Sequence, residues 1–193
     1  MVPFAKPFQV RIISGSYKGR RLHPPASLPV RPTTDFAKEG LFNILNRMID
    51  YEEVRVLDLF AGTGAISFEF YSRGVPAVTA VDIERHCVNF INETAGHFGM
   101  KGLNAVRANY LVFLRRSIER FDVIFADPPY DMPGLAGLPA LACASDVLND
   151  GGLLVLEHSD RYSFKNDPNF LETRNYGRVH FTFFRKAAGK GEA

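Results

Sequence analysis

From residue 54 onward, short runs of apolar residues alternate with segments of helical periodicity. The apolar runs are nearly continuous, which is typical of strands buried on both faces. These predicted strands cover residues 54–60, 78–82, 105–108, 121–126 and 153–157. Helices are predicted between them, over residues 65–73, from residue 85, over 111–118 and over 135–148. Strands that alternate with helices predict an α/β fold with a mostly parallel, doubly wound sheet.

Both ends of the chain depart from this rhythm. Residues 9–14 and 20–22 flank a glycine-rich turn and predict a small basic N-terminal hairpin, which a proline-rich linker over 23–32 follows. Thr33, Thr34 or Asp35 then caps a helix. Near the other end, residues 170–175 and 179–184 predict an antiparallel hairpin that finishes the sheet. We divide the chain into a hairpin with its linker (1–30), a main domain (31–186) and a flexible tail (187–193).

The composition is that of one soluble globular domain with a small appendage. The chain has 193 residues, of which 46% are apolar and 23% charged. Its apolar runs stay below the roughly 18 residues of a membrane helix, and the N-terminus lacks the apolar core of a signal peptide. Two cysteines cannot form a disulfide framework or a four-cysteine zinc site, and the five histidines have no metal-binding spacing. We therefore expect a cytoplasmic protein without a metal site. We also expect a monomer, because no apolar stripe is left over for a partner.

The charge is distributed unevenly along the chain. Residues 1–47 hold eight Lys and Arg against two acids, a net charge of +6, and residues 48–193 hold fifteen bases against nineteen acids, a net charge of −4. A basic arm on a mildly acidic body favours a polyanionic partner at one end of the molecule. A solvated surface face is the alternative that charge alone leaves open.

Polar residues interrupt the predicted strands at one recurrent place. Each lies at or near the carboxyl end of a strand; they are Asp58, Asp82, Asn109, Asp127 and Glu157. The carboxyl ends of parallel strands meet at one edge of the sheet, where open α/β folds bind their ligands. The pattern therefore predicts a site at this edge, which Glu157 either lines or merely caps.

The first part of this site is a glycine-rich turn. Gly62 and Gly64 allow a tight turn and the close approach of a ligand, and Asp82 follows at the distance of an acid that binds a ribose diol. A nicotinamide site uses the same geometry, but Ser67 replaces its third glycine and Asp58 would repel a pyrophosphate. A positively charged nucleoside without phosphates fits better, and S-adenosylmethionine is such a ligand.

The second part is Asp127-Pro128-Pro129-Tyr130, directly after a predicted strand. The two prolines stiffen the backbone and remove two N–H donors. What remains is a rigid pair of acceptors, the Asp127 carboxylate and the Pro128 carbonyl, beside an aromatic ring. This set suits a planar base with an exocyclic amine, stacked on Tyr130. Such an amine becomes accessible when the base leaves its stack.

The sequence at 56–64 (VLDLFAGTG) together with 127–130 (DPPY) resembles the class I S-adenosylmethionine-dependent methyltransferases that act on exocyclic amines. Four further segments, RIISG, KGR, RPTTD and EGLFNIL, resemble the RsmD family. These bacterial methyltransferases modify the N2 amine of a guanine in 16S ribosomal RNA. The resemblance runs from about residue 11 to residue 184.

The resemblance implies a Rossmann-like fold, S-adenosylmethionine as cofactor, and ribosomal RNA as substrate, either free or within the small ribosomal subunit. It implies cofactor contacts from Asp58, Ala61, Gly62, Gly64, Asp82, Ile83 and Asn109. It implies that Asp127, Pro128, Pro129 and Tyr130 hold the target base, and that RNA is met by Arg11, Lys18, Arg20, Arg21 and Arg31.

Two departures and two alternatives accompany this hypothesis. Asp82 stands where the family usually has Glu, and Phe36 and Ala37 stand where it usually has a second basic residue, which puts one phosphate contact in doubt. A DNA adenine-N6 methyltransferase would share the core motifs, although it normally needs a larger sequence-reading domain. An RNA-assembly factor that binds the cofactor without turnover is the other alternative. Which guanine would be modified stays open.

Overall fold

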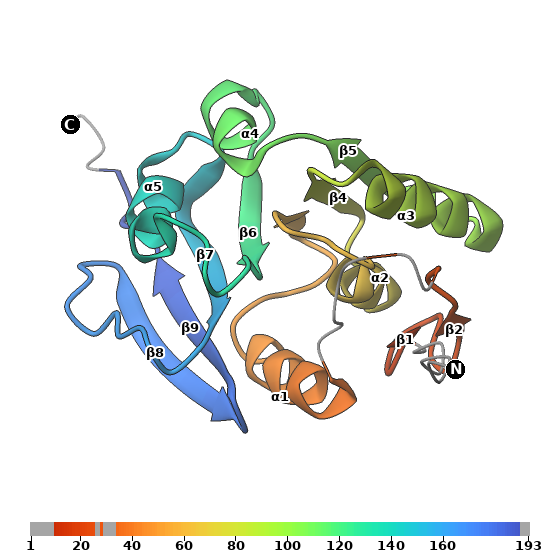
Figure 1. Ribbon diagram of the computed structural model, residues 1–193, viewed down its shortest axis with the longest axis horizontal. Helices are drawn as coiled ribbons and strands as arrows, with labels where there is room; N and C mark the ends of the chain where they lie inside the picture. Colours follow the sequence, from red (N-terminus) through yellow and green to blue (C-terminus); the bar gives the residue numbers. More distant parts are fainter. Residues whose placement is uncertain (1–9, 26–27, 29–33, 190–193) are drawn as a thin grey trace, which may run out of the picture.

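The computed structural model describes residues 10–25, 28 and 34–189, and the chain folds around a seven-stranded sheet (Figure 1). The strand order is β5-β4-β3-β6-β7-β9-β8. The strands are β3 (Arg55–Asp58), β4 (Ala77–Asp82), β5 (Leu103–Arg107), β6 (Phe121–Ala126), β7 (Leu148–His158), β8 (Phe170–Tyr176) and β9 (Val179–Arg185). Strands β3 to β7 pair in parallel, whereas β9 runs antiparallel to β7 and β8 antiparallel to β9.

The order in which the chain builds the sheet reverses next to β3. The chain first adds β4 and β5 on one side of β3 and then returns to add β6 and β7 on the other. In open α/β sheets this reversal opens a crevice at the carboxyl ends of the two strands. The parallel core, the reversal and the terminal hairpin confirm the predicted fold class.

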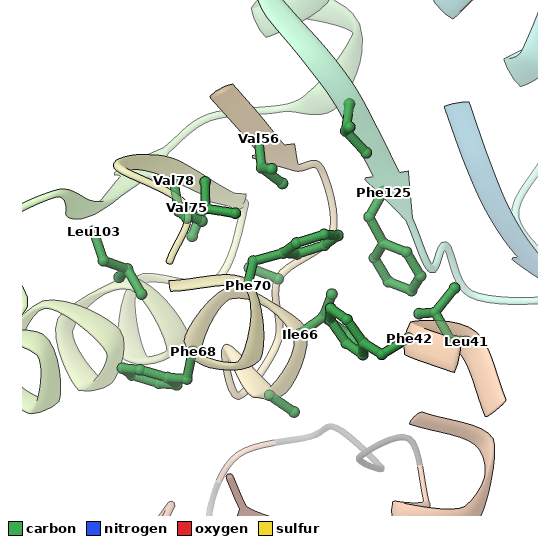
Figure 2. Close-up of a cluster of buried hydrophobic side chains, with 14 of the residues drawn as sticks. Leu41, Phe42, Val56, Ile66, Phe68, Phe70, Val75, Val78, Leu103 and Phe125 are labelled. Atoms are coloured by element: carbon green, nitrogen blue, oxygen red, sulfur yellow. The ribbon is translucent and has the colours of Figure 1, made fainter. Parts of the chain in front are cut away.

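Helices cover both faces of the sheet. The helices α1 (Asp35–Leu45), α2 (Ala65–Ser72) and α3 (Arg85–Phe98) pack on one face, and α4 (Tyr110–Arg116) and α5 (Leu138–Ala144) pack on the other. Neighbouring strand residues point to opposite faces, so Val56 belongs to the first apolar cluster and Leu57 to the second. Figure 2 shows the first cluster, in which the Phe42 and Phe70 rings meet edge to face at 4.9 Å. No helix within the described residues is long and apolar enough to span a membrane.

The predicted helix over 135–148 is wrong at both ends. The segment begins with a 3₁₀ turn, Leu135–Gly137, and α5 ends at Ala144, after which Ser145 is extended. Leu148 already belongs to β7, where it pairs with Phe121. The register shifts before the next pair, Val123 with Leu153, and the polar and glycine residues 149–152 lie in this irregular part of the strand.

The N-terminal hairpin is shorter than predicted, because its backbone is bonded to α2. Its two strands, β1 (Val10–Arg11) and β2 (Arg21–Leu22), have two residues each. The N–H groups of Ile13 and Ser14 donate to the two carboxylate oxygens of Glu69, at 2.9 and 3.0 Å, instead of to a partner strand. The hairpin therefore rests directly on the main fold.

One base of the predicted basic arm is not on the surface. Lys38 is 1% exposed, and its Nζ lies 3.6 Å from Glu69, which also binds Arg73 at 3.0 Å. Burial lowers the pKa of Lys38, and the negative charge of Glu69 opposes that effect. Lys38 thus joins α1 to α2 in the interior. It does not add to the positive surface charge that the count of basic residues in the arm implies.

Candidate active site at the carboxyl edge of the sheet

The polar residues predicted from the strand ends do meet at one edge. Asp58 is the last residue of β3 and Asp82 the last of β4, while Asp127 directly follows β6. Glu157 is the next-to-last residue of β7, and Asn109 caps α4 just beyond β5. Asp58 and Asp127 therefore stand on the two sides of the strand-order reversal.

Asp58 has a carboxylate oxygen without a partner. The side chain is 1% exposed, and its Oδ2 accepts a hydrogen bond from the Ser67 hydroxyl at 2.6 Å. Its Oδ1 is buried and has no hydrogen-bond partner among the described residues. Burial raises the pKa of Asp58 to about 7, with a smaller contribution from the charge of Asp82, while the Ser67 hydroxyl opposes the shift. A buried acceptor without a donor is costly, so this oxygen suits a donor that a ligand brings.

The glycine-rich turn is held by Asp82. Its two carboxylate oxygens accept the N–H groups of Gly62, at 2.7 Å, and Glu84, at 2.8 Å. Each carboxylate oxygen offers two lone-pair sites, so Asp82 keeps acceptor capacity for the predicted diol. Gly64 has a φ of +74°, and a Cβ there would lie 2.8 Å from both Phe68 and Ile91. Only glycine fits this position without a shift of the core.

An apolar surface lies next to the predicted adenine position. Ile83 directly follows Asp82 and is 57% exposed, although its side chain is large and apolar. Asn109 is exposed, and its Oδ1 accepts the Leu111 N–H at 2.9 Å, so it serves as a helix cap. The rings of Phe60 and Tyr110 contact each other at 5.0 Å, a pair that the sequence analysis missed. Both follow the ends of strands, and that position was the only signal for them.

The Asp127–Tyr130 corner lies beside Asp58 and Glu157. Pro128 is buried, Pro129 is exposed, and Asp127 and Tyr130 are half-buried. The pKa of Asp127 is raised well above its usual range, first by burial and then by the negative charges of Glu157 and Asp58. The Asp127 carboxyl therefore lies close enough to Glu157 and Asp58 to be affected by their negative charges.

Tyr130 is bound at both ends. Its hydroxyl donates to Glu157 Oε1 at 3.0 Å, and its backbone carbonyl accepts the hydroxyl of Tyr162 at 3.3 Å. The contact with Glu157 could be foreseen from neighbouring strand ends. Tyr162 was missed, because it lies on a loop without periodicity, and nothing in the sequence signals its contact.

The basic residues of the hairpin lie at the surface, and two of them contact α1 and α3. Arg11, Lys18, Arg20 and Arg21 are exposed, and Arg31 lies outside the described residues. Arg11 forms an ion pair with Asp35 at 2.9 Å, and the Arg20 guanidinium lies 4.8 Å from the centre of the Phe98 ring. In the described part of the chain, no three His, Cys, Asp or Glu side chains are placed to bind a metal ion.

Comparison with known proteins adds the family. The family described as conserved hypothetical protein 95 matches residues 10–185. Ribosomal RNA small subunit methyltransferase D of Escherichia coli K12 is 34% identical over 96% of this chain and 94% of its own. The protein of the same name from Haemophilus influenzae is 33% identical over 77% of this chain and 78% of its own.

The solved structures agree with this relationship. A hypothetical protein of Thermus thermophilus superposes with a TM-score of 0.77 at 34% identity, covering 91% of this chain and 98% of its own. The fold is also shared, with a TM-score of 0.72 at 21% identity over 93% of this chain and 50% of the other, by the T. thermophilus 16S rRNA N2 G1207 methyltransferase RsmC. The match over nearly the whole chain, together with the identity to the E. coli protein, shows that this chain belongs to the RsmD family.

Proposed function

We propose that this protein transfers a methyl group from S-adenosylmethionine to the exocyclic N2 amine of a guanine in small-subunit ribosomal RNA. One observation carries the proposal. A buried, unpartnered oxygen of Asp58 and the stiff Asp127–Tyr130 corner lie at the same edge, on the two sides of the strand-order reversal. The first suits a cation and the second an aromatic amine, which are the two reactants of the transfer.

The residues present fit the cofactor. Asp58 Oδ1 would accept a hydrogen bond from the ammonium group of the methionine half, and the turn at Ala61, Gly62 and Gly64 would let the backbone approach it. Asp82 would hold the ribose hydroxyls, and the exposed Ile83 and Asn109 would border the adenine. When bound, S-adenosylmethionine supplies the methyl group on a positively charged sulfur.

The corner orients the amine of the target base. The lone pair of such an amine is delocalised into the ring, so the amine is a weak nucleophile. The Asp127 carboxylate and the Pro128 carbonyl accept its two N–H groups, which localises and aims the lone pair, while Tyr130 stacks on the base. The N–C bond would form as the bond between the methyl group and the sulfur breaks, which leaves S-adenosylhomocysteine, and the amine loses one proton to Asp127 or to water. The protein thus contributes orientation and a desolvated pocket more than acid–base power.

The relatives support this substrate class over the alternatives. The E. coli and H. influenzae relatives are named ribosomal RNA small subunit methyltransferases. The T. thermophilus RsmC structure, which shares the fold, is a complex with AdoMet and guanosine. A DNA adenine-N6 enzyme finds no support among these relatives. An assembly factor without turnover has no use for acceptors aimed at an amine.

The proposal is tested by incubating the protein with labelled S-adenosylmethionine and three substrates: deproteinised ribosomal RNA, small ribosomal subunits that lack the modification, and double-stranded DNA. The methylated product is digested to nucleosides and identified by mass spectrometry. We expect label in RNA, as N2-methylguanosine, and none in DNA. Label in N6-methyladenosine, or no transfer to any of the three, contradicts the proposal. The RNA and the subunit arms also identify the form of the substrate.

A further inference from the structure

Glu157 is a buried acid that the proposed reaction does not use directly. It lies on β7 with 4% of its surface exposed and pairs across the sheet with Phe181 of β9. Burying a carboxyl group is unfavourable unless hydrogen bonds or other interactions replace its lost hydration. The structure shows two relationships that Glu157 has with the target-base corner, one through Tyr130 and one through Asp127.

The first relationship is a hydrogen bond to the ring that would hold the base. Glu157 Oε1 accepts the Tyr130 hydroxyl at 3.0 Å, and Tyr162 donates to the backbone carbonyl of Tyr130 at 3.3 Å. The Tyr162 ring in turn stacks on Phe164 with an interplanar angle of 13°, and Phe164 is buried. Two separate contacts, from β7 and from the loop after it, therefore fix the hydroxyl end and the backbone of Tyr130.

The second relationship follows from the end of the β6–β7 pairing. Ala126, the last residue of β6, pairs with Leu156 of β7, so Asp127 directly follows this pair on one segment and Glu157 on the other. The negative charge of Glu157 acts on the Asp127 carboxyl, so the two groups lie close together. Leu156 belongs to the apolar cluster on the α4 and α5 face, so its neighbour Glu157 points to the opposite face of the sheet, as does its cross-strand partner Phe181. Adjacent strands are about 4.8 Å apart, which brings the two carboxyl groups within range of each other's charge.

We propose that Glu157 is a positioning residue for methyl transfer, which holds the Tyr130 ring against the target base and places a negative charge beside Asp127. This inference rests on the proposed function and assigns a role to a residue of the same site. Glu157 touches neither reactant in this scheme. It acts through Tyr130 and Asp127, and its two effects can be separated by substitution.

The charge effect has a definite sign. The groups of the described structure that raise the pKa of Asp127 are Glu157 on β7 and Asp58 on β3, in addition to burial. A like charge disfavours ionisation of an acid. Removing the charge of Glu157 therefore lets Asp127 ionise at lower pH. Because the ionised carboxylate is the better acceptor for the amine, activity should persist to lower pH in the variant.

Three variants separate the two effects. Glu157→Gln removes the charge but keeps an amide oxygen that can accept the Tyr130 hydroxyl, and it should move the acid limb of the kcat profile to lower pH. Tyr130→Phe removes only the hydroxyl, and it should lower kcat about 10-fold without moving that limb, as expected for losing a hydrogen bond to a charged group. Glu157→Leu removes both, so it should show both effects, and adding Tyr130→Phe to it should cost little more.

The controls keep the test independent of folding and of the proposed function. Glu93→Gln removes an exposed acid on α3 and should leave kcat and its pH profile unchanged. Cofactor affinity and thermal unfolding of Glu157→Gln should match the wild type, and this near-isosteric variant still tests the charge effect if Glu157→Leu does not fold. A wild-type protein that transfers no methyl group would remove the proposed function itself. If the wild type methylates RNA while Glu157→Gln keeps the wild-type acid limb, or Tyr130→Phe keeps the wild-type kcat, the inference is wrong.

Discussion

At the scale of single residues, the candidate site depends on buried carboxyl groups. Asp58 has one oxygen bound to Ser67 and one buried oxygen without a partner in the described structure. Burial favours the neutral form of the carboxyl group over the charged form, and this raises the pKa of Asp58 to about 7. An ammonium group of a ligand would reverse the balance, because it stabilises the ionised form.

This balance predicts that cofactor affinity depends on pH. Below about pH 7 the Asp58 carboxyl is mostly protonated in the free protein, so binding a cation must release that proton. The dissociation constant of S-adenosylmethionine should therefore fall by up to about tenfold per pH unit as pH rises towards 7, and level off above it. Asp58→Asn should bind the cofactor more weakly and flatten this profile. Calorimetric titrations between pH 5.5 and 8.5 measure both, and a wild-type affinity that is constant over that range would contradict the role of Asp58.

At the scale of elements, α2 joins the site to the N-terminal hairpin. Ser67 on α2 holds Asp58, and two residues later Glu69 accepts the backbone of the hairpin and binds Lys38 of α1. Closer to its end, the Ser72 carbonyl accepts the Ser16 N–H at 2.7 Å. The hairpin is thereby placed relative to the site by one short helix. Displacement of the hairpin should therefore weaken RNA binding more than it weakens cofactor binding.

The contact at Gly15 tests this docking. Gly15 has a φ of +80°, and a Cβ there would lie 1.7 Å from the Ser72 carbonyl oxygen, whereas Gly19 has a φ of +84° and no atom within 4 Å of such a Cβ. Gly15→Ala should therefore cost about 3 kcal/mol of docking, the sum of backbone strain and collision, and Gly19→Ala about 1 kcal/mol of strain alone. Amide hydrogen exchange should show a larger loss of protection at Ile13 and Ser14 in Gly15→Ala. Equal losses in the two variants would mean that the hairpin is not held in this way.

Sequence patterns predicted the elements best where burial is uniform. Apolar runs located all five parallel strands, and the spacing of the strand-end polar residues placed them at one edge of the sheet, because the period of the βα unit determines both. The end of α5 was mispredicted because β7 starts in an irregular segment whose pairing with Phe121 is set by tertiary contact. For the same reason Tyr162 and the buried state of Lys38 could not be read from local sequence. Tyr162 lies on a loop without periodicity. Lys38 does share the helical spacing of Leu41 and Leu45 on the buried face of α1, but its burial depends on the distant partner Glu69.

At the scale of the whole molecule, the hairpin adds positive charge on the α1 and α2 side of the sheet. Arg20 and Arg21 lie on this hairpin, while a second pair of exposed arginines, Arg115 and Arg116, lies on α4 on the other face of the sheet. Polyanion binding is driven by the release of counterions from phosphates. If RNA binds at the hairpin, Arg20 and Arg21 should contribute to RNA binding and Arg115 and Arg116 should not, although the two pairs carry the same charge.

Charge reversal of the two arginine pairs should affect the salt dependence of RNA binding differently. Arg20→Glu with Arg21→Glu should weaken RNA binding and flatten its dependence on salt, by about 0.7 in the slope of log affinity against log salt concentration for each lost phosphate contact of a single strand. Arg115→Glu with Arg116→Glu makes the same change in net charge on the other face and should leave the slope unchanged. Filter binding from 50 to 300 mM salt measures both slopes. Equal slopes in the two double variants would exclude the hairpin as the RNA contact.

The most direct test of the central claim separates cofactor binding from methyl transfer at Asp127. The claim is that this carboxyl group serves the amine of the base and that Asp58, across the strand-order reversal, serves the cofactor. Asp127→Ala should therefore bind S-adenosylmethionine with nearly the wild-type dissociation constant but transfer no measurable methyl group to ribosomal RNA. An Asp127→Ala protein that still forms N2-methylguanosine at the wild-type rate would contradict this division of roles.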